Sequence, residues 1–491
     1  MSDTLFIHGH SCCEIRNKDT SIICDPWLLG SAYWRSWWNF PCASELEDLL
    51  DIWITKKNLW IYITHLHWDH FHGPTIRKIL KKCPNAKFII PKTPELRLIK
   101  DLKTIVDSKK IKELVHAKKY KLTSDIEILS FQSGPFLTDS AIAFITKKGT
   151  ILNLNDSKPM GLSLNHLKKI VPVPKYVLRS HASANDRCCM RAKENLNEES
   201  LSNNNWDKNK KIYSEEFFEA CFDFKSKYAL PFASNMACLH KETFQYNKIL
   251  NFADYCVKDF ENAKDNYEGM NCLLLSPTES LDIETGNILT NLKIKNDMKN
   301  IERNQHLKNI QNSYKEKLEK QYLIESNTKI NKKSFEKYFN RIINCTPYFL
   351  RLYLSDSIVF ETFNKNSTTY FLLDFKNKNI KELSQPINLM SIPIRVRVHS
   401  YVINDVCNKS HYNSLGVSKR LTVWQSKNEK RYVIFNFLCI VIENFGFLPL
   451  KNILKKRFIL VWLSRYSEIV DLIILAMTLI LNPKKKYYTN K

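Results

Sequence analysis

Residues that can bind a metal ion lie close together in the first part of the chain: His65, His67, Asp69 and His70. Imidazole nitrogens and carboxylate oxygens are ligands of zinc, iron and manganese. With only 13 histidines in 491 residues, four of them at positions 65–72 favour a metal site over a chance run of surface histidines. The sequence therefore predicts one or two divalent ions, with zinc first and iron or manganese as alternatives. A bound ion lowers the pKa of water to about 7, and Asp69 is the candidate catalytic residue that holds or receives its proton.

The apolar segment 60–63 predicts a buried strand that delivers this cluster to a loop at its end. Other segments have strand length and composition, and helical stretches lie between them. Such an alternation predicts a layered α/β fold. The expected strands are 4–7, 12–15, 21–24, 87–90, 126–131, 141–145, 150–154 and 228–232, and the expected helices are 44–52, 74–82, 94–102 and 214–227.

The pattern H-x-H-x-D-H at 65–70 resembles the signature of the metallo-β-lactamase superfamily. The resemblance implies an αββα sandwich, with His65 and His67 on one metal and Asp69 and His70 on a second. It also implies a carboxylate that bridges two metals after a later strand. Asp156, which follows the strand-like segment 150–154, is that candidate, although an isolated Asp in a turn is usually a cap.

Further landmarks are similar to the CMP-N-acetylneuraminate hydroxylase family. These are Asp25-Pro26-Trp27-Leu28, Ser36-Trp37-Trp38, the metal loop, 151–156, Leu230-Pro231-Phe232-Ala233 with His240 following, and more faintly 371–375, 395–398 and 415–424. Only the metal loop is individually specific. The resemblance implies a small-molecule substrate such as a sugar nucleotide.

The sequence departs from these families in two ways. A Rieske iron–sulfur cluster needs C-x-H and C-x-x-H pairs, and only one C-x-H occurs, at Cys238-Leu239-His240. An oxygenase of this kind would therefore take electrons from a separate Rieske-type protein. The histidine expected after 126–131 is also absent from Gln132 to Asp139. His240 is the favoured replacement ligand because it follows a strand end, and His181, His8 and His10 are the alternatives; a structural, hydrogen-bonded role stays open for each.

Two other features flank the predicted site. Asp25 follows the strand 21–24, where a carboxylate can orient a ligating imidazole. Trp34, Trp37 and Trp38 either line a substrate mouth or pack in the core, and core packing is favoured.

The chain is long enough for more than one domain. We expect a metal-binding metallo-β-lactamase-like domain at 1–290, a polar linker or exposed helix at 291–333, and a smaller C-terminal α+β domain at 334–491 that ends in an apolar tail helix. The tail, 458–482, contains Arg465, Glu468 and Asp471, so a buried or interfacial helix is favoured over a membrane span. Peripheral membrane contact through this tail and Lys484-Lys485-Lys486 is the alternative to ordinary solvated lysines.

A net charge of +24 is compatible with a phosphate-bearing partner, but lysines are spread along the chain and no nucleic-acid-binding motif is present. Nucleic acid is therefore not favoured as a partner. The 14 cysteines show no C-x-x-C spacing, and the first residues lack the features of a secretory signal, so a reduced cytoplasmic protein is expected.

Three functions follow from these observations. The first is a metal-dependent hydrolase acting on a sugar, a sugar nucleotide or a phosphodiester. The second is an oxygenase component that acts on an N-acyl sugar nucleotide with a separate electron donor. The third is a non-catalytic module that has lost part of its metal site.

Overall fold

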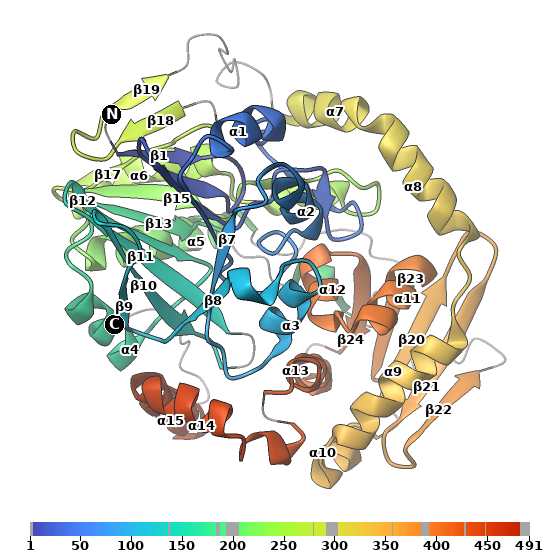
Figure 1. The fold of residues 1–491 in the computed structure, drawn as a ribbon. Coiled ribbons are helices and arrows are strands. Elements are labelled where there is room, and N and C mark those ends of the chain that lie inside the picture. Colours follow the sequence, from blue (N-terminus) through green and yellow to red (C-terminus); the bar gives the residue numbers. More distant parts are fainter. Residues whose placement is uncertain are drawn as a thin grey trace.

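The computed structural model describes residues 3–135, 138–182, 187–192, 206–277, 279–290, 303–355, 357–383, 392–426, 429–446 and 448–481. Within these residues, two large sheets lie face to face, and a third sheet and several helices lie beside them (Figure 1).

The first sheet has eight strands and contains the strand that precedes the metal loop. Its centre is parallel, and a helix connects each pair of consecutive parallel strands, as βαβ geometry requires. Apolar side chains of these helices, such as Leu49, Ile76 and Leu102, pack on its outer face. In spatial order the strands are β19 (Ile288–Thr290), β18 (Glu279–Asp282), β1 (Thr4–Ile7), β2 (Cys13–Arg16), β3 (Thr20–Cys24), β6 (Asn58–Tyr62), β7 (Lys87–Pro91) and β8 (Ile111–Leu114), and the helices are α1 (Leu46–Trp53), α2 (Gly73–Lys82) and α3 (Arg97–Lys103).

The second sheet has seven strands and carries its own helices on the other outer face. Phe217 and Phe218 of one helix and Phe260 of another fill the space against the sheet. In spatial order the strands are β17 (Asn271–Cys272), β15 (Tyr228–Phe232), β13 (Tyr176–Ser180), β12 (Gly149–Asn155), β11 (Asp139–Thr146), β10 (Ile126–Ser133) and β9 (Lys119–Lys121), and the helices are α4 (Gly161–Ile170), α5 (Trp206–Asp223) and α6 (Ala253–Ala263).

Between the two sheets lies a dry core to which both contribute, including Ile15, Ile22, Ile128, Phe144 and Leu178. The order of layers is therefore helix, sheet, sheet, helix, and the predicted αββα sandwich is confirmed. The expected strands at 4–7 and 228–232 coincide with β1 and β15, and the others differ from the observed bounds by one or two residues.

The rest of the chain forms a third, six-stranded sheet with helices on it. In spatial order its strands are β14 (Met190–Ala192), β24 (Leu421–Gln425), β23 (Ile394–His399), β20 (Ile358–Phe363), β21 (Thr368–Asp374) and β22 (Asn379–Leu383), and the helices are α7 (Arg303–Ser313), α8 (Lys315–Asn327), α9 (Lys332–Cys345), α10 (Tyr348–Tyr353), α11 (Ser400–Lys409), α12 (Tyr412–Ser418) and α13 (Arg431–Asn444). Strand β14 comes from the first half of the chain and pairs with β24. Of the predicted linker, 291–302 lies outside the described residues, and α7 and α8 form an arc between the two parts (Figure 1).

One apolar core joins the two parts. A small sheet of β16 (Met236–Cys238), β5 (Trp37–Asn39) and β4 (Ser31–Ala32) covers one end of the sandwich. Its Trp38 ring lies 4.0 Å from the ring of Tyr314, between α7 and α8. The same cluster of buried side chains continues through Leu318 to Phe360 and Phe435 of the third sheet and its helices. The division at residue 291 stays a prediction.

Two helices complete the described chain, α14 (Lys456–Ser464) and α15 (Tyr466–Leu481). The three charged residues that interrupt the apolar tail are buried against the sandwich. Among the helices that the structure describes, none has both the length and the apolar character needed to cross a bilayer.

The shared core gives a test of the predicted domain boundary. A chain that ends at residue 290 would leave Trp34, Trp38 and Phe40 without the side chains of the later helices, and each buried aromatic contributes roughly 1.5–3 kcal/mol when withdrawn from water. We expect the truncated chain to unfold at a lower temperature than the full chain and to bind a hydrophobic dye. In the full chain, Trp38→Ala should reproduce part of that loss. An unchanged melting temperature without dye binding would establish residues 1–290 as self-contained.

Candidate metal centre

The metal loop begins where β6 ends and stops where α2 begins. Pro74 occupies the first turn of α2, where a missing backbone N–H costs nothing. Within the loop, the backbone N–H groups of His70 and Phe71 donate to the carbonyl of His67, at 3.1 and 2.7 Å. This tight turn brings His70 back over His65, so that their ring centroids are 4.1 Å apart.

The carboxylate of Asp25, at the end of β3, holds this loop in place. One oxygen accepts from the backbone N–H of Thr64 at 2.8 Å. The other accepts from the Thr64 hydroxyl at 2.7 Å and from the Asn155 side-chain amide at 2.9 Å. Nδ1 of His70 lies 2.9 Å from the second oxygen. The predicted contact of Asp25 with an imidazole is therefore present, and Nε2 of His70 is left to face the other polar side chains.

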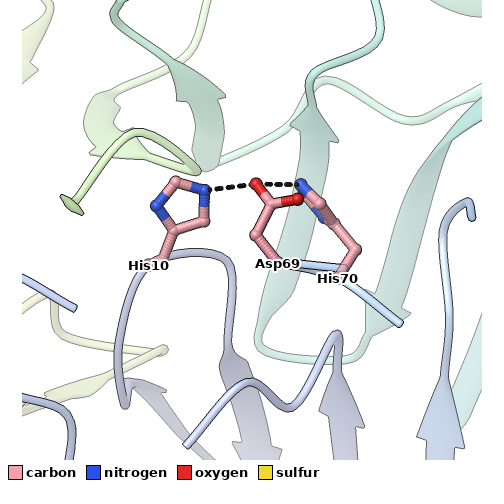
Figure 2. A group of neighbouring side chains, drawn as sticks. All are labelled: His10, Asp69 and His70. Carbon is pink, nitrogen blue, oxygen red and sulfur yellow. Dashed lines mark ion pairs between the residues drawn. The ribbon is translucent and has the colours of Figure 1, made fainter. Parts of the chain in front are cut away.

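His70 belongs to a first group of potential metal ligands, together with His10 and Asp69 (Figure 2). One carboxylate oxygen of Asp69, Oδ2, lies 3.0 Å from Nε2 of His10 and 3.4 Å from Nε2 of His70. His10 comes from the loop between β1 and β2, so this group joins two loops at the same end of the first sheet. All three side chains are buried.

A second group consists of His65, His70 and Asp156. Asp156 follows β12 of the second sheet, and its Oδ2 lies 3.4 Å from Nε2 of His70. Nε2 of His65 lies 2.8 Å from Nδ1 of His67, which places His67 beside this group. The structure thus brings together five of the six residues that the sequence indicated as metal ligands: His65, His67, Asp69, His70 and Asp156.

The donor set fits a divalent cation. Nε2 of His70 and both ring nitrogens of His10 are buried, and among the described residues none of them has a partner with hydrogen-bond geometry. Such atoms are costly to bury unless another ligand satisfies them. Burial lowers the pKa of His67 to about 4. Burial alone would raise the pKa of the Asp69 carboxyl, but His70 and His10 hold it well below its usual range. A neutral imidazole and an ionised carboxylate are the forms that bind metal, and His67 and Asp69 are in these forms. Burial alone would lower the pKa of His70, but Asp69 and Asp25 raise it, so His70 must release a proton when it binds an ion.

His240 does not lie in this cluster. Its Nε2 lies 3.3 Å from Glu325, and its ring packs on Tyr322 at 4.9 Å. Both residues belong to α8, and the Arg420 guanidinium also binds Glu325. The suggestion of His240 as a ligand is corrected accordingly, because its imidazole lies beside Glu325 and Arg420 and belongs to neither group of potential ligands.

The other three histidines that the sequence offered as replacement ligands lie in different surroundings. His8 is bound by Glu14 (2.8 Å) and Ser44 (3.1 Å). His181 follows β13 and is in neither group. Of the three alternatives named from the sequence, only His10 joins the potential ligands.

The segment after β10, where the sequence analysis expected a histidine, supplies a carboxylate instead. Asp139, at the start of β11, lies 3.2 Å from Nδ1 of His65. The carboxylate therefore contacts the side of the ring away from His67, where it can orient the imidazole. Sequence reasoning missed Asp139 because it searched this segment for a histidine.

Tyr33 was also missed, and its hydroxyl donates to Oδ1 of Asp69 at 2.5 Å. Tyr33, Trp34 and Arg35 have φ values of 52°, 54° and 66°, a left-handed conformation that is unfavourable for residues with a side chain. Arg420 donates to the Trp34 carbonyl (2.8 Å), and Nε1 of Trp34 donates to Asp405 (2.9 Å). The third sheet and its helices thus hold the turn that presents Tyr33.

A cavity of about 170 Å³ adjoins these groups. His10, Asp69 and Asp156 line one side, and Trp37, Lys158 and Asn251 are among the residues of the rest of its wall. Trp34, Trp37 and Trp38 are all buried in the shared core, as favoured from the sequence, and Trp37 also lines this cavity.

Comparisons with known proteins confirm the resemblance inferred from the sequence. A proposed Rieske 2Fe-2S iron–sulfur protein of Mycolicibacterium smegmatis is 30% identical over 170 residues, which cover 32% of this chain and 30% of that protein. The cytidine monophosphate-N-acetylneuraminic acid hydroxylase of Sus scrofa is 34% identical over 86 residues, 17% of this chain and 18% of the hydroxylase. The matched segments thus span less than a third of these relatives. No protein-family model matches the chain.

Solved structures with a partly similar fold include a metallo hydrolase of Ignicoccus hospitalis, with 14% identity and a TM-score of 0.37, covering 60% of this chain and all of the other. The diiron β-hydroxylase CmlA of Streptomyces venezuelae has 14% identity and a TM-score of 0.37, covering 59% of this chain and 54% of the other. Likenesses at this level do not bear on function.

The Tyr33 hydroxyl can be tested apart from its ring. Tyr33→Phe keeps the packing on Trp37 and Trp68 but removes the donor to Asp69. We expect metal affinity to fall by about 10–100-fold, as for other groups that orient metal ligands. The measurement is a titration of the metal-free protein with zinc, iron(II) or manganese(II).

Tyr176→Phe is the matched control, because it also removes a buried hydroxyl, whose partner is the carbonyl of Ile283 far from the site. Both variants should lose about 1 kcal/mol of unfolding free energy. Equal metal affinities in the two variants would show that the Tyr33 hydroxyl only stabilises the fold.

Proposed function

We propose that this protein is a metal-dependent enzyme with a site for one or two divalent ions. Its ligands are His65, His67, Asp69, His70 and Asp156, and His10 takes the place first given to His240. The observation that carries the proposal is the pair of ligand groups that share His70 and adjoin one cavity. Buried ring nitrogens support the proposal: Nδ1 of His10 and Nε2 of His70 have no hydrogen bond within the described residues, whereas Nδ1 of His70 is held by Asp25.

When bound, a divalent ion supplies Lewis acidity and lowers the pKa of a water molecule toward neutrality. The protein's own groups supply position and proton transfer. Oδ1 of Asp69 is held by Tyr33, so Oδ2, which lies beside His10 and His70, is the oxygen that is left to bind an ion or receive a proton. Asp25 and Asp139 fix the rings of His70 and His65 by contacts on the sides away from the cluster.

The reaction that we propose first is hydrolysis of a small molecule, with zinc as the first candidate ion and iron or manganese as alternatives. A sugar, a sugar nucleotide or a phosphodiester is the proposed substrate class. Lys158 supports an anionic substrate, because it is a basic residue that lines the cavity together with Asp156, and its ammonium group lies 3.9 Å from Glu216. An anionic group held there would place the bond to be cleaved next to the ligand groups.

A second candidate is an oxygenase component with iron in the same site and a separate Rieske-type electron donor. The names of the matched relatives favour it, since one is a proposed Rieske protein and another is a hydroxylase of an N-acyl sugar nucleotide. Histidine and carboxylate ligands suit iron as well as zinc.

Two assays separate these reactions. The purified protein is loaded with zinc or with iron(II) and offered lactone, phosphodiester and sugar-nucleotide substrates under anaerobic conditions. Product formation without oxygen supports hydrolysis. Activity that needs iron, oxygen and an added reductant supports the oxygenase, and a loaded protein that is inactive in both assays leaves the non-catalytic module.

The first metal prediction concerns His65 and His67. We expect replacement of both by Ala to lower the metal content, measured by elemental analysis, by at least one ion per chain, because His65 belongs to the second group and His67 lies directly beside it. His72→Ala is the control in the same loop, since its imidazole binds Thr75 and is in neither group. If the double variant retains the metal of the unmodified protein, the ligands are elsewhere.

The second concerns Asp156, which joins the second sheet to the site. Asp156→Asn keeps the shape but removes the negative charge that would hold two ions together, so metal content should fall to one ion or fewer. Any hydrolytic rate should fall by at least about tenfold, since the ion supplies the nucleophile. Asp125→Asn, in an exposed turn, should change neither value. Normal metal content with higher stability would make Asp156 only a turn residue.

A further inference from the structure

The C-terminal helices α14 and α15 attach to the sandwich through charged groups on one face. Arg465 is buried, pairs with Glu468, and donates to the carbonyl of Gly134 at 2.7 Å. Glu468 accepts from the backbone N–H of Gly134, also at 2.7 Å. The carboxylate of Asp471 accepts from the N–H groups of Leu162 and Ser163 (both 2.8 Å), at the N-terminus of α4, where the helix dipole favours an anion. These contacts fix which face of α15 is turned inward.

The opposite face of the two helices is apolar and open to solvent. Eight large apolar side chains on it are between 38% and 62% exposed: Ile459, Leu460, Leu463, Tyr466, Val470, Ile473, Ile474 and Met477. Scattered exposed apolar residues are ordinary, but these eight recur at helical spacing along two consecutive helices, which indicates an interaction surface. We name these eight residues the tail face.

Among the described residues of the segment 455–481, the exposed charged side chains are all positive. Both acidic residues of the segment 455–481, Glu468 and Asp471, are buried in the docking contacts, so among its described side chains no exposed acid remains. Lys455 and Lys456 are exposed at the start of α14. The sequence after α15 continues with Lys484-Lys485-Lys486, and the whole chain has a net charge of +24.

We propose that the tail face rests on an anionic lipid surface, with α14 and α15 lying in the plane of the interface. An apolar stripe bordered by lysines is the pattern of helices that bury one face at the headgroup boundary, where tyrosine is also favoured. Because the other face is fixed to α4 and to the loop after β10, only the stripe meets lipid. The lysines then contact acidic headgroups.

A second copy of this chain fits the tail face less well. A two-fold contact would bring Lys455 and Lys456 of both copies to one interface, where the described residues of the segment 455–481 offer no exposed acid to pair with them. The ten residues 482–491 contain four lysines and are too polar to cover an apolar stripe.

The experiment is flotation of the full-length protein with vesicles of phosphatidylcholine alone or with about one fifth phosphatidylserine. We expect binding to the mixed vesicles, and at least tenfold weaker binding to phosphatidylcholine alone. Leu463→Glu combined with Ile474→Glu should reduce binding at least tenfold, because two exposed apolar side chains become acidic. Leu289→Glu combined with Leu323→Glu is the matched control, since both residues are exposed and apolar but lie on β19 and α8. It should bind as the unmodified protein does.

A third variant, with Lys484, Lys485 and Lys486 changed to Gln, should lose the preference for phosphatidylserine. Metal content and melting temperature are measured for every variant, so that a change at the metal centre or in folding is recognised. Absence of vesicle binding by the unmodified protein overturns the proposal. So does equal binding by the tail-face variant and its control. A dimer in sedimentation velocity that only the tail-face variant disrupts, without vesicle binding, assigns the tail face to a second copy instead.

Discussion

The carboxylate of Asp25 is the contact on which the arrangement of the site depends. It is completely buried at the end of a strand in one sheet, and it accepts from Thr64 in the metal loop and from Asn155 in the other sheet. A buried anion is tolerated only where several donors surround it, so the ends of three strands must meet there. His70 is held by the same carboxylate, and its free nitrogen is therefore fixed at the junction between the two sheets.

This junction explains why both ligand groups include His70. The first group closes on it from the loop of His10 within the first sheet, and the second closes on it from Asp156 of the second sheet. The third sheet contributes indirectly. Arg420 binds the carbonyl of Trp34, and the adjacent Tyr33 binds Asp69. A substitution far along the chain can thus alter the site through the left-handed turn that carries Tyr33.

The αββα layers and the main ligand loop could be predicted because they depend on local pattern. Apolar segments of strand length gave the strands, and the spacing of His65 to His70 placed donors at a strand end. His10 could be named only as one of three alternatives to His240, and Tyr33 was missed, since each reaches Asp69 only through tertiary packing. His240 was misplaced for the same reason: nothing near it in the sequence indicates that Glu325, 85 positions later, would hold its imidazole.

The charged residues of the tail both exclude a membrane-spanning helix and attach α15 to the sandwich. In the sequence, Arg465, Glu468 and Asp471 argue against a membrane span because charges interrupt an apolar segment. In the structure all three lie on one face, where Arg465 and Glu468 bind the loop after β10 and Asp471 binds the N-terminus of α4. The apolar residues between them therefore gather on the other face. Charges that exclude a spanning helix are here the ones that orient a surface helix, because they decide which side remains exposed.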